Sequence, residues 1–380
     1  MTTSFQYYES AGSSKAREQL AAWRSEHPEM GLLALVTEAD REQEIPAIQE
    51  ACARLSLPVI GSVFPSVIFQ SRFLRRGVNL FRFDAMPFHL LRSSADASGE
   101  SWPESLGKDI ACRVGESRGG ALFLIFDQMV PNIATILDGL YLSLADRVRY
   151  LGVNAGSETF RPIPCLFDST RIAQGGAIAL LLDNHPGAVV EHCYQAPERL
   201  VSATATEGNR IITIDWRPAF EVYRETVRSE YGVVIDGSNF YQYAVHFPFG
   251  IVRAGNEIIV RIPVALQPDG SLFCVGEIPP NSVLTLLRAP EVDSVRTVDA
   301  LVQGLKNLCG DPAGADILAF YCAGRKIHLG DRADWELAQL GNRSGAANVA
   351  GALSLGEIGH SLQWGYPLFH NGALVCCRWG

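Results

Sequence analysis

The chain has 380 residues, of which 47% are hydrophobic and 19% charged, and its formal net charge is -9. This composition is typical of a globular protein and excludes a disordered one, and the length predicts two domains or two closely packed subdomains. No basic run exceeds Arg75-Arg76, and every apolar run is far shorter than the ~20 residues that span a bilayer, so we expect no nucleic-acid partner and no membrane partner.

The cysteines and the N-terminus point to the cytoplasm. The 9 cysteines are irregularly spaced, which suits reduced thiols better than a disulfide framework. Met1 to Arg17 lacks the basic start, apolar stretch and cleavage site of a signal peptide. No CxxC pair occurs, so no metal site is predicted.

The first predicted element is a helix that follows a mobile start and runs from an N-cap at Ser13 or Ser14 to about Glu26. A buried strand is predicted at Gly31–Val36, followed by a helix with Pro46 near its first turn and by a short strand that ends in glycine. The segment therefore has the order strand, helix, strand, glycine.

This order recurs from Ala121–Asp127 and again from Asp316–Gly324. The segment Ala95–Gly107 between the first two units is rich in Ser, Gly and acidic residues and predicts a loop. Three such units indicate duplication of one supersecondary element. We predict an α/β fold with two related halves, each a mixed β-sheet covered by helices, packed as a layered α-β-β-α body.

A strand-rich stretch separates the second and third units. Its predicted strands are Arg210–Trp216, Ile258–Leu266, Leu272–Ile278 and Ser282–Arg288. One helix interrupts them, with Pro218 in its first turn and Gly232 as its stop signal. The domain boundary is expected near Ala196–Ser202, which divides the chain into an extension at 1–29, an N-terminal domain at 30–198 and a C-terminal domain at 199–380.

The most distinctive cluster of polar and glycine residues is C-terminal and falls at predicted strand ends and turns, where open α/β sheets bind ligands. Arg325, Glu357 and Asn371 offer a cation, an anion and a neutral amide, a set that suits an amino acid. The alternative is that Arg325 and Glu357 form an ion pair that orders two turns and holds no ligand. The candidate ligand-binding residues are Cys322, Arg325, Gly356, Glu357, His370 and Asn371.

The motifs YCAGR, SLGEIGH and FHN around these residues resemble, in order, the signatures of the FIST C-terminal domain. LGVNAGS and the following CLFDSTRIAQGGAIALLL resemble the end of the FIST N-terminal domain. The resemblance implies a sensory input domain, found alone or joined to signalling outputs, that binds small ligands such as amino acids. Because no kinase, cyclase or receptor segment follows, we expect the signal to pass to a separate protein such as a histidine kinase.

One departure from the family concerns the turn after Gly61. SVFPSVIFQ stands there in place of the Gly-Glu-Ile type of turn, which puts an N-terminal contribution to the pocket in doubt.

The resemblance also implies two alternatives to a metabolite sensor. Some FIST proteins resemble nitric-oxide sensors that hold haem, and haem needs an axial ligand in an apolar pocket. His246 and His192 have the most suitable neighbours for that role. Related domains in eukaryotic ubiquitin-ligase subunits use the fold for binding, which leaves a protein-interaction scaffold as the second alternative.

A cysteine-dependent enzyme is the third alternative. Arg325 lies near Cys322 and its charge would lower the pKa of the thiol, while His370 would act as the base. The use of related domains for binding argues against catalysis, and no catalytic residue is assigned.

Overall fold

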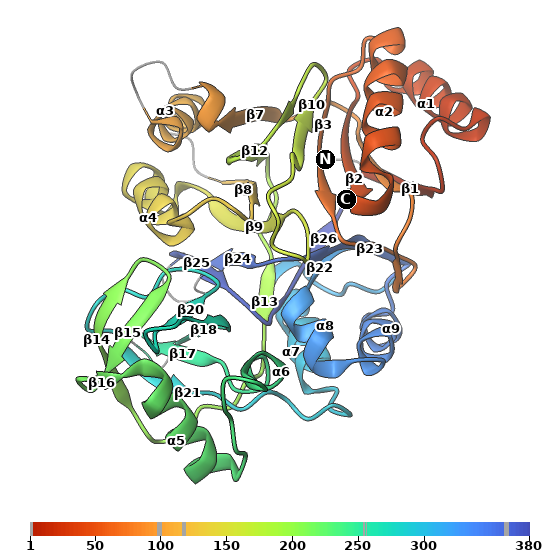
Figure 1. Cartoon of the computed structure of the whole chain (residues 1–380). Helices are drawn as coiled ribbons and strands as arrows, with labels where there is room; N and C mark the ends of the chain where they lie inside the picture. Colours follow the sequence, from red (N-terminus) through yellow and green to blue (C-terminus); the bar gives the residue numbers. More distant parts are fainter. Residues whose placement is uncertain (1–2, 97–100, 116–118, 254, 256, 361–364) are drawn as a thin grey trace.

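The computed structural model describes residues 3–96, 101–115, 119–253, 255, 257–360 and 365–380. Within these residues the strands form three six-stranded sheets and one eight-stranded sheet (Figure 1). Each six-stranded sheet belongs to one of three units, called here the N-terminal, middle and C-terminal units. The eight-stranded sheet belongs to a segment, called the insert, that interrupts the C-terminal unit.

The elements of the N-terminal unit are β1 (Thr3–Tyr8), α1 (Ser14–Glu26), β2 (Gly31–Thr37), α2 (Arg41–Leu55), β3 (Val59–Phe64), β4 (Val67–Phe69), β5 (Arg72–Leu74) and β6 (Val78–Phe83). Those of the middle unit are β7 (Phe88–Ser93), α3 (Trp102–Val114), β8 (Ala121–Asp127), α4 (Ile133–Leu144), β9 (Arg149–Ala155), β10 (Leu166–Asp168), β11 (Ile172–Ala173) and β12 (Gly176–Leu182).

The C-terminal unit consists of β13 (Val189–Glu191), α7 (Arg296–Cys309), β22 (Asp316–Cys322), α8 (Ala323–Leu329), α9 (Arg332–Ser344), β23 (Asn348–Ser354), β24 (Glu357–His360), β25 (Pro367–His370) and β26 (Leu374–Trp379). The insert consists of β14 (Val201–Glu207), β15 (Arg210–Ile214), β16 (Arg217–Pro218), α5 (Ala219–Tyr231), α6 (Phe240–Ala244), β17 (Phe249–Val252), β18 (Ile258–Arg261), β19 (Pro263–Leu266), β20 (Leu272–Cys274) and β21 (Val283–Leu286).

The three units share one topology. In each, two central parallel strands are joined by a helical crossover: β2 with β3, β8 with β9, and β22 with β23. An antiparallel strand flanks the first of each pair, and the orders β1-β6-β2-β3-β10-β11, β7-β12-β8-β9-β24-β25 and β13-β26-β22-β23-β4-β5 are equivalent position by position. The recurring order of elements in the sequence is therefore the structural repeat.

The last two strands of each sheet are a hairpin that comes from a different unit. The hairpin β4–β5 leaves the N-terminal unit and pairs with β23 of the C-terminal unit. The hairpin β10–β11 leaves the middle unit and pairs with β3, and the hairpin β24–β25 leaves the C-terminal unit and pairs with β9. The exchange runs around all three units, so each sheet is completed by a neighbour.

A glycine occupies the same position in the second parallel strand of each unit. Gly61, Gly152 and Gly351 stand opposite Ala34, Leu124 and Ala319 of the first strand. A Cβ atom added to any of the three would lie 2.5, 2.3 or 1.8 Å, respectively, from the carbonyl oxygen opposite. Close contact between the two backbones requires glycine at each of these positions.

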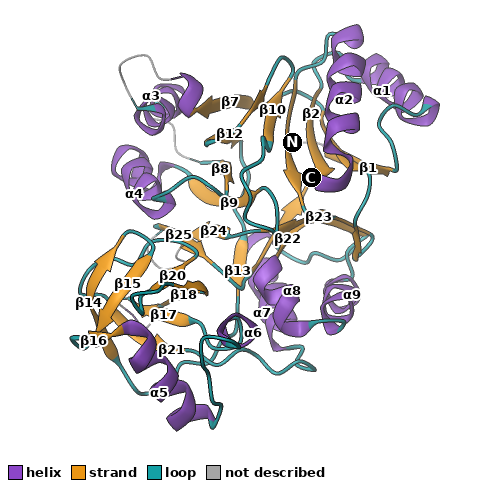
Figure 2. Cartoon of the chain, in the orientation of Figure 1, coloured by secondary structure: helices purple, strands orange, loops and turns teal. Residues whose placement is uncertain are grey.

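The three sheets pack around one apolar core and carry their helices outside. One cluster of buried side chains joins residues of all three sheets, and in it the rings of Phe64 and Phe123 both contact the ring of Phe320. The middle and C-terminal sheets turn their other faces to α3 and α4 and to α7 and α9 (Figure 2). The predicted α/β class is confirmed, and any two sheets with their helices form the expected α-β-β-α layers. The repeating body has three units in place of the two halves expected.

Three local predictions from the sequence were wrong. The start is not mobile, because β1 pairs with β6 from Thr3 to Tyr8. The segment predicted as a loop contains the start of α3, where Ser101 and Glu104 form a capping box. Pro46 lies inside α2, which already begins at Arg41. The predicted helix after Pro218 is confirmed as α5, and it ends at Gly232, whose φ is 70°.

No helix in the described part of the chain is long and apolar enough to span a membrane.

Candidate functional site

A cleft separates the insert from the middle and C-terminal units. It consists of a cavity of about 680 Å³ and a smaller one of about 60 Å³, which share Glu158, Phe160, Tyr241, Val264 and Val275 as walls and are therefore continuous. The insert contributes α6, β19 and β20, and the other side comes from the ends of β8 and β9 and from the start of α8.

Three polar side chains enter the cleft where the parallel strands β8 and β9 end. Gln128 follows β8, Asn154 is near the end of β9, and Glu158 follows β9. The Gln128 side chain is fixed because its Nε2 donates a hydrogen bond of 2.6 Å to the Ser157 carbonyl. Its Oε1 and the Oδ1 of Asn154 are buried, and neither has a hydrogen-bond partner among the described residues. The carboxyl ends of adjacent parallel strands are the usual place for ligands in α/β sheets.

The backbone of Asn154 is held by the turn between β23 and β24. Its N–H donates to the Gly356 carbonyl at 2.9 Å, and its carbonyl accepts from Leu355 N at 3.1 Å. A Cβ on Gly356 would lie 2.5 Å from the Phe369 ring and 3.1 Å from the Asn154 amide. Gly356, which the sequence predicts as a site residue, thus provides the space in which Asn154 and Phe369 meet.

Aromatic rings form much of the cleft wall. Phe160, Tyr241, Phe273 and Phe369 line the larger cavity. Behind Phe369, the guanidinium carbon of Arg261 lies 5.4 Å from the ring centre. Burial lowers the pKa of Arg261 to about 10. The wall is therefore apolar and aromatic, with a buried cation one layer behind it.

Two of the predicted site residues, Cys322 and Asn371, line the smaller cavity. Asn371 uses its Oδ1 to accept a hydrogen bond from Ile262 N at 3.2 Å, and so joins the insert to the C-terminal unit. Cys322 accepts a hydrogen bond of 3.0 Å from Gly372 N on its sulfur. Burial, reinforced by Glu357, raises the pKa of the Cys322 thiol. The expectation of a lowered pKa was wrong, because burial outweighs the hydrogen bond from the Arg325 backbone N–H, and a thiol that stays protonated argues against a nucleophile.

Arg325 lies outside the cleft and is almost completely buried. Its Nε and Nη2 donate to Glu336 at 2.8 and 2.6 Å, and Nη2 also donates to Thr297 at 2.7 Å. Its Nη1 donates to the carbonyls of His192 and Gly372. All five donors of the guanidinium are occupied within the protein. The ion-pair alternative describes this residue best, with Glu336 as its partner in place of Glu357.

Glu357 and His370 face each other across β24 and β25 but do not line the cleft. Glu357 accepts hydrogen bonds from Ser354 at 2.6 Å and from Ala373 N at 3.3 Å. Burial raises the pKa of Glu357 to about 8 and holds the pKa of His370 well below its usual range. Both are neutral buried groups, and neither is placed to receive a ligand amine in the cleft.

The two histidines weighed as haem ligands do not fit that role. His192 uses both ring nitrogens, because Nδ1 accepts from Tyr194 N and Nε2 lies 3.3 Å from the Ile258 carbonyl. His246 has its Nδ1 2.6 Å from Nδ1 of His328. Neither lines the cleft or the groove described next. An axial ligand needs a free nitrogen that faces an apolar pocket, and these residues do not supply one.

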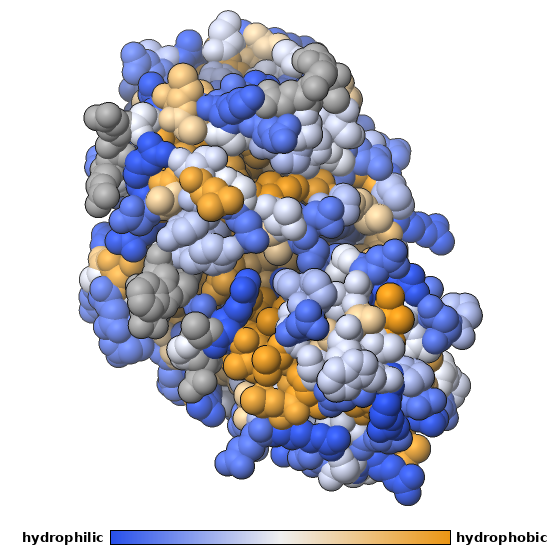
Figure 3. Space-filling model, turned by 90° about the vertical axis from the view of Figure 1, so that its left-hand side faces the viewer, coloured by the Kyte–Doolittle hydropathy of each residue, from blue (hydrophilic) through white to orange (hydrophobic). Residues whose placement is uncertain are grey.

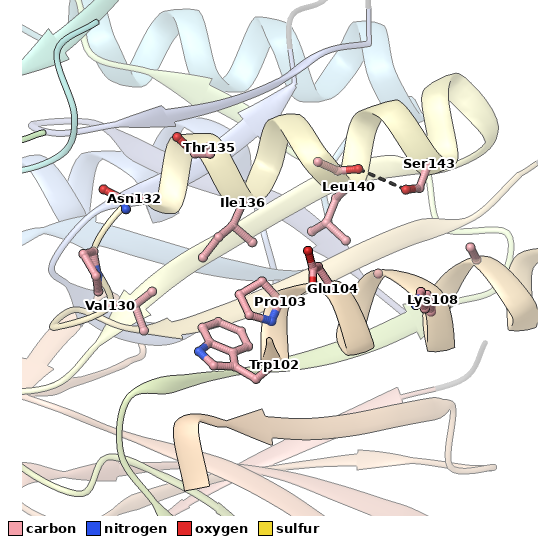
Figure 4. A pocket seen from close by; sticks show the side chains of 14 residues that line it. Trp102, Pro103, Glu104, Lys108, Val130, Asn132, Thr135, Ile136, Leu140 and Ser143 are labelled. Atoms are coloured by element: carbon pink, nitrogen blue, oxygen red, sulfur yellow. Dashed lines mark hydrogen bonds between the residues drawn. The ribbon is translucent and has the colours of Figure 1, made fainter. Parts of the chain in front are cut away.

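A second hollow is the groove of about 790 Å³ between α3 and α4 (Figure 4). Trp102, Ile136 and Leu140 point into it. Two of its polar groups already have partners, because Ser143 donates to the Gly139 carbonyl and Thr135 donates to Glu277 of the loop that follows β20. On this side of the molecule apolar side chains gather in hollows of the surface (Figure 3). None of the buried unpartnered polar atoms in the described residues lines the groove, which makes the cleft the better candidate.

Comparisons with known proteins identify two family domains. A family model described as the FIST N domain matches residues 30–217, and one described as the FIST C domain matches residues 219–360. No curated protein matches the chain.

Proposed function

The chain belongs to the FIST family, whose sensory domains are found in signal-transduction proteins, and we propose that it binds a small molecule in the cleft between the insert and the middle unit. The observation that carries this proposal is the Asn154 side chain. It is 1% exposed, it lines the cleft, and its Oδ1 has no partner among the described residues. A buried polar group without a partner costs roughly 1–3 kcal/mol, a cost that a ligand hydrogen bond would remove.

The position of the cleft suggests how binding would be transmitted. A ligand there contacts β19 and β20 of the insert together with the ends of β8 and β9. Nearly all of the apolar cluster in the insert comes from the insert itself, with Leu368 of β25 as its buried contact from the C-terminal unit, so the insert can shift as a body against the three units. Binding would favour the closed arrangement, and the altered surface would be recognised by a separate signalling protein such as a histidine kinase.

Among the alternatives, the cleft favours ligand binding over a protein-interaction scaffold, because two residues that line it carry buried polar atoms without partners. Haem binding and cysteine chemistry receive no support from the surroundings of His192, His246 and Cys322.

The experiment is a thermal-shift screen of the full chain against amino acids, amines and other metabolites, followed by calorimetry of each hit. Ala265→Trp, on β19, fills the larger cavity and should abolish binding of every hit. Ala53→Trp, on the exposed face of α2, is the matched control and should leave binding unchanged. A hit that binds Ala265→Trp as tightly as the unchanged protein would place the ligand elsewhere and refute the proposal.

A further inference from the structure

We infer that the cleft takes an organic amine: a protonated nitrogen carried on an apolar body, without a carboxylate or phosphate. This inference rests on the proposed function and adds the chemical class of the ligand. It follows from the hydrogen-bond acceptors and the charges that line the cleft.

The polar groups at the ends of β8 and β9 offer acceptors. Gln128 presents an unpartnered Oε1, Asn154 an unpartnered Oδ1, and Glu158 a carboxylate that forms no ion pair with a described residue. An ammonium group has three N–H donors and no acceptor, so acceptors of this kind can pair with it and leave none of its polar atoms facing a donor.

The cleft has no group that would take an anion. Among the described residues that line its two cavities, none is Lys, Arg or His. A carboxylate or phosphate placed there would lose its hydration without gaining a cationic partner, and it would lie near Glu158. The same lining therefore selects an amine and rejects an amino acid.

Arg261 packs against the wall from behind but does not line the cleft. Its guanidinium lies behind the Phe369 ring and donates to the carbonyls of Glu277, Val260 and Phe369. The Glu277 carboxylate stabilises the positive charge of Arg261, because it raises the pKa of the guanidinium, which burial lowers. Arg261 therefore leaves the side of the Phe369 ring that lines the cleft available to a ligand, and aromatic faces attract cations.

The repeat shows that the polar side chain at Asn154 is specific to the cleft. Gly61, Gly152 and Gly351 are equivalent, so Asn154 corresponds to Val63 and Leu353. Both are buried apolar residues in the other two units. The fold therefore accepts an apolar side chain at this position, so packing alone does not explain the amide of Asn154 in the middle unit.

The test is calorimetric titration of the full chain with three compounds of similar size: phenethylammonium chloride, sodium 3-phenylpropionate and phenylalanine. The amine should bind, and the carboxylate and the zwitterion should bind at least tenfold more weakly, about 1.4 kcal/mol or more. Asn154→Leu, which introduces the residue of the C-terminal unit, should weaken amine binding by at least about tenfold.

Glu158→Gln should weaken amine binding by about three- to fivefold, since the carboxylate is exposed and screened. Glu18→Gln, on the exposed face of α1, is the matched control and should have no effect. Tighter binding of phenylalanine or 3-phenylpropionate than of the amine, or amine binding that Asn154→Leu and Glu158→Gln leave unchanged, would overturn the amine assignment. Failure of all three compounds would also overturn it, while the metabolite screen with Ala265→Trp separately decides whether the cleft binds a ligand.

Discussion

Arg325 and Glu336 form an ion pair whose side chains are 1% and 2% exposed. We predict that Arg325→Met destabilises the protein by roughly 3–5 kcal/mol, because it leaves the Glu336 carboxylate buried without its cation. Urea unfolding would measure the loss. The double variant Arg325→Met/Glu336→Gln should regain part of it, since no uncompensated charge remains.

The control is Arg343→Met, which removes an exposed ion pair with Asp299 and should cost at most about 1 kcal/mol. If Arg325→Met kept its stability and lost only ligand affinity, Arg325 would be a ligand anchor after all.

Glu357 makes the free energy of unfolding depend on pH. Its pKa is near 4.5 in the unfolded chain and about 8 in the folded one. Between these values the folded state holds a proton that the unfolded state has released. The contribution of this proton to the free energy of unfolding is therefore fully present below pH 4.5 and is lost as the pH rises to about 8. Glu357→Gln removes this dependence.

The measurement is urea unfolding of both proteins from pH 5 to pH 8. The unfolding free energy of Glu357→Gln should rise relative to that of the unchanged protein by up to about 1.4 kcal/mol per pH unit. A difference that stays constant over this range would show that Glu357 ionises normally.

At the scale of single residues, the sequence predicted two residues that line the proposed cleft and missed the polar groups at its centre. Cys322 and Asn371 do line the cleft, because Cys322 ends β22 and Asn371 follows β25, and the ends of strands lie together at one edge of a sheet. Arg325 was found but its role was not, since its partner Glu336 lies on a helix that no motif connects to it. Asn154 and Gln128 were missed. The available signal was a polar residue inside the buried strand β9, at a position that is apolar in the two equivalent strands.

At the scale of elements, the three equivalent glycines test the repeat. Gly61→Ala, Gly152→Ala and Gly351→Ala should each destabilise the protein by more than about 2 kcal/mol, because the new methyl group would press on a backbone carbonyl that cannot rotate away. Thermal unfolding of the three variants would measure the effect.

Gly139→Ala is the control for these substitutions. Gly139 lies inside α4 with nothing within 4 Å of an added Cβ, so alanine should leave stability unchanged or raise it by up to about 1 kcal/mol. Unchanged stability in Gly61→Ala, Gly152→Ala or Gly351→Ala would mean that the two strands can move apart there.

Elements with strong local signals were predicted well, and elements that depend on distant partners were not. Ser13 caps α1 and Gly232 ends α5, as the sequence predicts, because caps act within one turn. The strand β1 was missed, because it is held in place by pairing with β6, about 70 residues further along the chain, and not by a local signal. The exchange of hairpins could not be predicted, because each of these short strands pairs with a segment far away in the sequence.

At the scale of the whole molecule, a histidine pair joins the insert to the C-terminal unit. His328 uses Nε2 toward the Pro290 carbonyl at 2.9 Å, so its Nδ1 is left to accept the hydrogen bond from His246. Burial lowers the pKa of both. Because the unfolded state binds more protons below pH 6.5, this contact should weaken as the pH falls from 7 to 5.

Hydrogen exchange of the backbone amides, corrected for intrinsic rates, would measure this effect in α6 and α8. Protection there should decrease with acidification in the unchanged protein and depend less on pH in His246→Gln/His328→Gln. An equal pH dependence in both proteins would assign the change to other groups.

The exchange of hairpins also determines when the molecule can complete its fold. The strand β4 pairs with residues 350–352, which are translated long after β4 itself. Until then β4 and β5 pair only with each other, and exposed strand edges promote aggregation. Contacts so distant in sequence also slow folding. The hairpin β4–β5 of a newly made chain therefore stays incomplete during synthesis, and its maturation waits for the segment that contains β23 to be translated.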